Sequence, residues 1–158
     1  MNCTAQPMDL MSRVQGFMTF KVKQYSEELA EKYGVPEEEI SDIVSDFLRN
    51  SYGPAVEVAE SISRRERPVV LFIGREGCAI CQRSKPELDH FLQNHNDLEP
   101  VLLDYSNPEG LLYHMIQQGE TGLLPMIAMI HHGGIRMIFT GECVHPDVYE
   151  HYYVAMIT

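Results

Sequence analysis

Apolar side chains recur every three or four residues through the first part of the chain, which is the spacing of amphipathic helices. A first helix is predicted over residues 8–33, and Gly34 stands where a left-handed C-cap would end it. Pro36 opens a second helix, which the polar residues 50–53 are expected to end. Pro54 then opens a third helix, so three helices in succession are predicted.

The pattern changes to continuous apolar runs of strand length from residue 69 onward. The runs at 69–73 and 101–103 are predicted to be strands buried on both faces. Residues 126–130 and 135–139 are predicted to form a hairpin, because a Gly-Gly turn separates them. Further helices are predicted over residues 78–94, 107–118 and 145–156.

The predicted order from residue 54 onward is α-β-α-β-α-β-β-α, which indicates the α/β class. We expect a central mixed sheet flanked by helices in residues 54–158, preceded by a helical extension in residues 1–53. Two amphipathic helices cannot leave their apolar stripes in water. They must therefore pack on the sheet domain, on each other or on a second chain. We expect the extension to form a homodimer that buries Met11, Met18, Phe47 and Leu48, or else to dock a partner protein.

Composition narrows the class of protein. The 158 residues are 44% hydrophobic and 22% charged, as in ordinary globular proteins. Twelve basic against twenty-three acidic residues give a net charge of −11, which argues against nucleic acid and anionic membrane surfaces as partners. No apolar run reaches the ~18 residues of a spanning helix, and the first residues lack the features of a secretory signal. We therefore expect a cytoplasmic protein without membrane contact.

Four cysteines are too few for a disulfide scaffold in a chain of this length. Cys78 and Cys81 form one C-x-x-C, whereas Cys3 and Cys143 are isolated. A structural zinc site usually has a second close pair, and an iron–sulfur cluster would need Cys3 and Cys143 to converge on the first pair. No metal and no cofactor is therefore expected, and whether Cys3 or Cys143 takes part in the chemistry stays open.

The C-x-x-C lies between a predicted buried strand and a predicted helix. Cys78 would then occupy the helix N-terminus, where unpaired backbone N–H groups and the helix dipole favour the thiolate. Cys81 would lie about one turn further on, shielded beneath it. Such a pair can attack a disulfide with the first sulfur and resolve the mixed disulfide with the second. The alternative is that both residues are inert core cysteines.

Several further positions, in order, make residues 54–158 resemble a thioredoxin. Pro86 follows the second cysteine by five residues, where thioredoxins kink the active-site helix. Leu124-Pro125 precedes the third strand at a thioredoxin-like distance from the cysteines. Gly133 and Gly141 fall at family positions in the hairpin turn and after the last strand. The region is therefore similar to members of the thioredoxin superfamily.

The resemblance implies a role for each of these residues. Cys78 would be the nucleophile and Cys81 the resolving thiol. Pro125 would follow a cis peptide bond and shape the substrate groove, Leu124 would offer backbone groups to an extended peptide, and Gly141 would keep the rim of the groove open. The substrate-binding residues it implies are Ala79, Ile80, Leu124, Pro125 and Gly141.

The chain also departs from the family pattern near the cysteines. Gly77 replaces the usual Trp, and Ala-Ile stands between the cysteines instead of Gly-Pro. Phe72 occupies the position of the buried acid that assists proton transfer to the resolving cysteine. Glu142 is the nearest substitute by position.

The resulting functional hypothesis is a thiol–disulfide oxidoreductase. Cys78 and Cys81 would exchange a dithiol and a disulfide with protein substrates through a mixed disulfide, and an unidentified reductase would recharge the pair. One alternative is a binding or assembly module that uses the same scaffold with little or no catalysis. A metal carrier is a further, less favoured alternative. The direction of electron flow stays open.

Overall fold

The computed structural model describes residues 8–117 and 123–158 of the chain. The elements follow in the order β1 (Met8–Asp9), α1 (Leu10–Tyr33), α2 (Glu37–Arg64), β2 (Val69–Gly74), α3 (Ala79–Leu92), β3 (Glu99–Asp104), the 3-10 helix η1 (Pro108–Leu111), α4 (Leu112–Ile116), β4 (Met126–His131), β5 (Gly134–Thr140) and α5 (Pro146–Ile157). The predicted strands and most of the predicted helices are confirmed. However, β3 is an edge strand and is not buried on both faces as predicted, because its residue Leu102 is 53% exposed. The helix predicted over residues 107–118 is instead the short pair η1 and α4.

The strands form one mixed sheet in the order β1-β5-β4-β2-β3. Only β2 and β3 are parallel; their register runs from Val69 opposite Glu99 to Gly74 opposite Asp104. All six residues of β2 are buried, because the strand is paired on both edges and covered on both faces. This confirms an α/β fold with a central mixed sheet flanked by helices.

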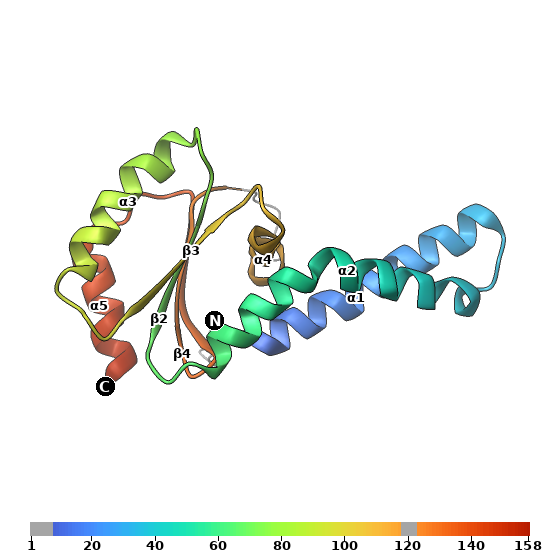
Figure 1. Ribbon diagram of the computed structural model, residues 1–158, viewed down its shortest axis with the longest axis horizontal. Helices are drawn as coiled ribbons and strands as arrows, with labels where there is room; N and C mark the ends of the chain where they lie inside the picture. Colours follow the sequence, from blue (N-terminus) through green and yellow to red (C-terminus); the bar gives the residue numbers. More distant parts are fainter. Residues whose placement is uncertain (1–7, 118–122) are drawn as a thin grey trace, which may run out of the picture.

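Helices form a layer on each face of the sheet (Figure 1). Helices α3 and α5 pack together on one face, while η1, α4 and the bases of α1 and α2 lie on the other. The short strand β1 adds an edge to the sheet by pairing Met8 with Ile135 of β5. The sequence did not indicate β1, because a strand of two residues is too short to show an alternation of apolar and polar side chains. Asp9 then caps α1 by accepting a hydrogen bond from the N–H of Ser12 at 2.9 Å.

Helix α2 corrects the prediction of two helices broken at residues 50–53. It runs unbroken from Glu37 to Arg64 with Pro54 inside it. A proline inside a helix removes one hydrogen bond. The apolar stripe nevertheless stays in phase across it, through the buried residues Val44, Leu48, Ala55, Ala59 and Ile62. Packing of this stripe outweighs the local breaker, so the expected boundary between 1–53 and 54–158 falls within a single helix.

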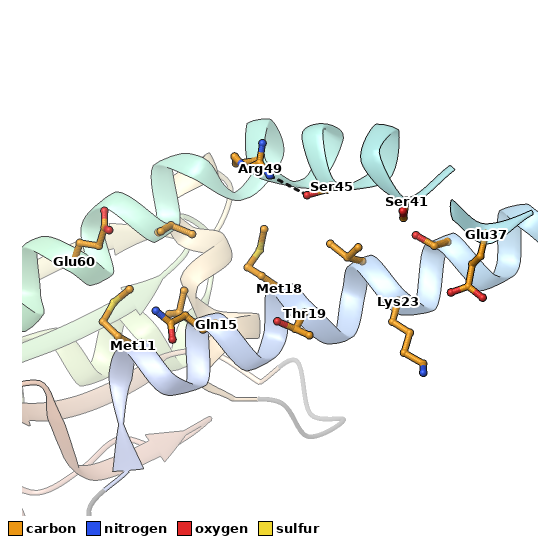
Figure 2. A pocket seen from close by; sticks show the side chains of 14 residues that line it. Met11, Gln15, Met18, Thr19, Lys23, Glu37, Ser41, Ser45, Arg49 and Glu60 are labelled. Atoms are coloured by element: carbon orange, nitrogen blue, oxygen red, sulfur yellow. Dashed lines mark hydrogen bonds between the residues drawn. The ribbon is translucent and has the colours of Figure 1, made fainter. Parts of the chain in front are cut away.

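Helices α1 and α2 form an antiparallel hairpin that projects away from the sheet (Figure 1). Gly34 has a φ of 66° and ends α1 as predicted. The four residues expected at a dimer interface do not share one surface. Leu48 is already buried within the chain, whereas Met11 and Met18 line a groove of about 700 Å³ between the helices (Figure 2). Phe47 lies on the opposite flank and is 63% exposed.

The junction between the hairpin and the sheet is held by two ion pairs. Glu99 at the start of β3 binds Arg65 at 3.1 Å and Arg67 at 3.5 Å. Both arginines belong to the connection between α2 and β2, so the end of the hairpin is fixed to the neighbouring strand. Among the helices of the described residues, none is both long and apolar enough to cross a membrane.

Candidate functional site

The two cysteines of the C-x-x-C lie where β2 passes into α3. Gly77, with a φ of 83°, turns the chain after the loop that follows β2. Cys78 is the N-cap of α3, and its Sγ accepts a hydrogen bond from the N–H of Cys81 at 3.2 Å. A sulfur in this position satisfies one of the free donors of the first helical turn. The structure thus places Cys78 and Cys81 together, as predicted, and both are free thiols.

The surroundings of Cys78 lower the pKa of its thiol below the ordinary value. Partial burial acts to raise this pKa. It is outweighed by hydrogen bonds from the Cys81 side chain and from the backbone N–H groups of Cys81 and Ile80, with a smaller contribution from the positive charge of Arg75. Each of these interactions stabilises the thiolate, the reactive form of cysteine.

Cys81 has the opposite environment. Its side chain is 6% exposed, and this burial, together with the interaction with the Cys78 sulfur, raises the pKa of its thiol to about 11. Cys81 therefore remains protonated at neutral pH, while Cys78 is half-exposed. The pair thus combines one accessible sulfur that favours the anion with one shielded sulfur that favours the thiol.

The segment before β4 faces the exposed sulfur. The peptide bond between Leu124 and Pro125 is cis, as the resemblance implied. The thiol of Cys78 points to the carbonyl of Leu124 with an S···O distance of 3.9 Å. The Leu124 side chain is only 8% exposed, so this residue can offer its backbone but little apolar surface. Gly141 donates its N–H to the carbonyl of Pro125 at 2.9 Å, which holds the end of β5 against this segment.

Leu123 is an apolar residue of this rim that the sequence analysis did not single out. Its side chain is 54% exposed, and a Cβ added at Gly141 would lie 2.9 Å from its Cβ. Its carbonyl accepts a hydrogen bond from the hydroxyl of buried Tyr113 at 2.8 Å. Ala79 is exposed and Ile80 half-buried on the first turn of α3. The exposed apolar surface beside Cys78 is thus contributed by Leu123, with Ala79 and Ile80.

The structure places both Phe72, which stands where thioredoxins have a buried acid, and Glu142, the expected substitute for that acid. Phe72 is 7% exposed and lies on β2, where it lines a pocket that also reaches Cys81. Glu142, the acid expected to replace the missing one, has an exposed side chain and does not line this pocket. Its backbone carbonyl accepts a hydrogen bond from Ser84 of α3 at 3.4 Å.

Cys143 does not join the pair. Cys143 is exposed, and its Sγ lies 3.5 Å from the carbonyl of Arg83. Cys3 lies outside the described residues. Within residues 8–117 and 123–158, no three His, Cys, Asp or Glu side chains come together as a metal site would require.

Comparison with solved structures identifies the fold. Mitochondrial thioredoxin 3 from Saccharomyces cerevisiae in its oxidized form matches 64% of this chain and 94% of its own, with 17% identity and a TM-score of 0.50. Fasciola hepatica thioredoxin matches 63% and 92% at 17% identity and the same TM-score. The short form of spinach chloroplast thioredoxin f matches 63% and 84% at 16% identity, again with a TM-score of 0.50. No family model and no curated protein matches the sequence.

These likenesses show that the chain has the thioredoxin fold. The share of the chain that these structures cover is close to the length of residues 54–158, which contain the sheet apart from β1. The hairpin of α1 and α2 precedes most of this region.

Proposed function

We propose that the protein is a thiol–disulfide oxidoreductase that acts on protein disulfides. The observation that carries this proposal is the contrast between the two sulfurs: the pKa of Cys78 is lowered, whereas that of Cys81 is raised to about 11. A nucleophile must be a thiolate at neutral pH, and a resolving thiol is best kept protonated until a mixed disulfide has formed.

The reaction balances as a dithiol–disulfide exchange. The Cys78 thiolate attacks one sulfur of the substrate disulfide, forms a mixed disulfide and releases one substrate thiolate. Cys81 loses its proton and attacks Cys78 Sγ, which releases the second substrate thiolate. The substrate disulfide is thereby reduced by two electrons, and Cys78 and Cys81 become a disulfide. A cytoplasmic reductase of unknown identity would return the pair to the dithiol.

The substrate groove would lie between Leu124-Pro125 and the first turn of α3. An extended peptide could accept or donate backbone hydrogen bonds at Leu124, whose carbonyl faces Cys78. Exposed Leu123 and Ala79, with half-buried Ile80, would receive apolar side chains beside the disulfide. Gly141 would keep the rim open, because a side chain at this position would collide with Leu123.

The test is the reduction of insulin by dithiothreitol. We expect the wild-type protein to accelerate it, the Cys78→Ser variant to lose the acceleration, and Cys81→Ser to accumulate a mixed disulfide with insulin. Cys143→Ser, which changes an exposed cysteine away from the pair, serves as the matched control and keeps the activity. No acceleration by correctly folded wild-type protein would contradict the proposal.

A binding or assembly module is a second candidate, favoured by one observation. Phe72 fills the buried position beneath Cys81 where an acid would assist proton transfer, so catalysis could be slow. Such a module would keep its affinity for a partner in the Cys78→Ser variant, whereas an oxidoreductase would lose its covalent complexes.

The hairpin would supply a contact with a second copy of the chain. Its outer flank carries Tyr25, Leu29, Ile43 and Phe47 around a pocket of about 370 Å³; we call these four residues the flank patch. Ile43 is 68% and Phe47 is 63% exposed. Pairing two such patches would remove these side chains from water, which supports a homodimer through the hairpin.

A further inference from the structure

Cys81 must lose its proton before it can resolve a mixed disulfide, and at neutral pH its environment keeps the proton in place. A base within reach would therefore speed this step. The side chain on β2 beneath Cys81 is Phe72, which cannot accept a proton. Another group must therefore accept the proton of Cys81.

One pocket, of about 390 Å³, is lined by Cys81 and provides a path for water; we call it the Cys81 pocket. Its charged lining residues, within the part of the chain that the structure describes, come from three places: Arg75 from the loop after β2, Lys85 from α3, and Asp104 from β3. Arg75 and Lys85 are cations, and Lys85 also binds Asp89 at 2.9 Å. Asp104 alone of the three can accept a proton.

The sheet register places Asp104 on the same face of the sheet as Cys81. Asp104 pairs with Gly74 in the parallel ladder of β2 and β3, so their Cα–Cβ bonds point to the same face of the sheet. A Cβ added at Gly74 would lie 3.4 Å from Cys81 Sγ. Neighbouring strands are about 4.8 Å apart, so the backbone of Asp104 lies about 10 Å or less from that sulfur, a gap that the carboxylate and one or two waters can span.

The missing side chain at Gly74 keeps this gap open. A Cβ there would also lie 2.8 Å from Cε1 of Phe72, so even alanine would crowd the space between Asp104 and Cys81. The carboxylate is oriented locally, because Asp104 Oδ1 accepts a hydrogen bond from the N–H of Ser106 at 2.7 Å.

We propose that Asp104, acting through water in the Cys81 pocket, accepts the proton of Cys81 when the mixed disulfide is resolved. This inference rests on the proposed function. In the step, the S–H bond of Cys81 breaks, its proton passes through water to the Asp104 carboxylate, and the Cys81 sulfur bonds to Cys78 Sγ. The substrate thiolate leaves with the electron pair of the broken S–S bond, and the proton returns to solvent from Asp104.

The test separates the two chemical steps. Reduced protein is mixed with a limiting amount of an aromatic disulfide whose released thiolate is coloured. The first, bimolecular phase reports attack by Cys78, and the second, unimolecular phase reports resolution by Cys81. At about pH 7 we expect Asp104→Asn to slow the second phase at least ~10-fold, since a positioned base contributes ~100-fold or more. The first phase should stay within about twofold of wild type, and Asp104→Glu should restore part of the second.

The pH dependence of the second phase distinguishes a base from a residue that only supports the structure, because a purely structural role of Asp104 would not change it. In wild type the second phase should change little around neutral pH, whereas in Asp104→Asn it should rise ~10-fold per pH unit as hydroxide replaces the lost base. Glu142→Gln is the matched control, because it removes an exposed carboxylate that does not line the Cys81 pocket; both of its phases should match wild type.

Different outcomes overturn the two proposals. A wild-type first phase no faster than that of a cysteine peptide would overturn the proposed function, and the role of Asp104 with it. A normal first phase followed by an unchanged second phase in Asp104→Asn would overturn the role of Asp104 alone. If Asp104→Asn did not fold, the wild-type profile would decide: a second phase that rises ~10-fold per pH unit through neutrality would overturn the role.

Discussion

The backbone N–H of Cys81 donates a hydrogen bond to Sγ of Cys78 at 3.2 Å, so the residue that we propose as the resolving thiol also stabilises the sulfur that we propose as the nucleophile. The contact follows from the N-cap position of Cys78, which directs its side chain toward the first turn of α3. Because the donor is a backbone group, this contact survives replacement of the Cys81 side chain. Cys81→Ser also keeps a hydroxyl in place of the thiol that hydrogen-bonds Cys78, so this variant is the suitable reporter for Cys78.

The alkylation rate of Cys78 should show a lowered pKa. The thiolate is the reactive form, so the rate should rise with pH through a midpoint below 9.0 and then level off. The measurement is site-specific alkylation by iodoacetamide in the Cys81→Ser variant, read by mass spectrometry. In Cys78→Ser the remaining Cys81 should titrate well above 9.0, since burial raises its pKa. A Cys78 midpoint at or above 9.0 would contradict the expected thiolate.

Replacing Gly141 with alanine should impair protein substrates more than small ones. Gly141 has a φ of 72°, and the new Cβ would press on Leu123 at the rim of the groove. A left-handed non-glycine residue costs about 1–2 kcal/mol of folding free energy. We expect a loss of that size in urea denaturation and a drop in kcat/KM for insulin, while the rate with a small aromatic disulfide stays close to wild type. Equal losses with both substrates would argue against a groove at this rim.

Removing the hydroxyl of Tyr113 should loosen the same rim. Tyr113→Phe deletes the donor to the Leu123 carbonyl, and a typical hydrogen bond contributes about 1 kcal/mol. The free energy of unfolding should fall by about that amount, and insulin reduction should slow. Tyr152→Phe, on the half-buried side of α5, is a matched control expected to leave insulin reduction unchanged. An unaltered rate in Tyr113→Phe would show that this contact does not position the groove.

Replacing Pro54 with alanine should stabilise the protein. The change restores a backbone donor inside α2, and proline in a helix interior costs up to about 3 kcal/mol relative to alanine. Thermal and urea denaturation should both show the gain. Pro146→Ala is the control, since Pro146 begins α5, where proline is favourable and no gain is expected. A loss of stability in Pro54→Ala would contradict this expectation.

The flank patch should determine the oligomeric state. Phe47→Ser should shift the sedimentation coefficient from dimer toward monomer at micromolar concentration, because it removes the largest exposed apolar side chain of the patch. Phe20→Ser is the matched control: Phe20 is 61% exposed on α1 but does not line the patch. A wild-type protein that sediments as a monomer would contradict the homodimer.

The sequence was most informative where the apolar pattern is long and regular. The buried run of β2 and the hairpin of β4 and β5 were predicted because they are continuous apolar runs of strand length, and a Gly-Gly turn separates the last two. The break at residues 50–53 was wrong because Gly53 and Pro54 are local signals. The stripe from Val44 to Ile62 is instead set by packing against α1 and, toward the end of α2, against η1, α4 and β4.

Around the candidate site, the cysteines could be placed from their spacing, but their neighbours could not. Leu123 is a single leucine with no pattern of its own, and its exposure depends on how the chain approaches Pro125. Asp104 gains its position from the pairing of β3 with Gly74, which depends on strand order and register. Neither quantity can be obtained from the local sequence.

The projecting hairpin is connected through the backbone to the candidate site at Cys78. Helix α1 is about 36 Å long, so a sideways force at its far end acts on the base of the hairpin through a lever arm of that length. Helix α2 leads through the segment clamped by Glu99 directly into β2, and β2 leads to Cys78. A load applied to the tip is therefore transmitted along α2 to β2, the strand that leads into the loop before Cys78.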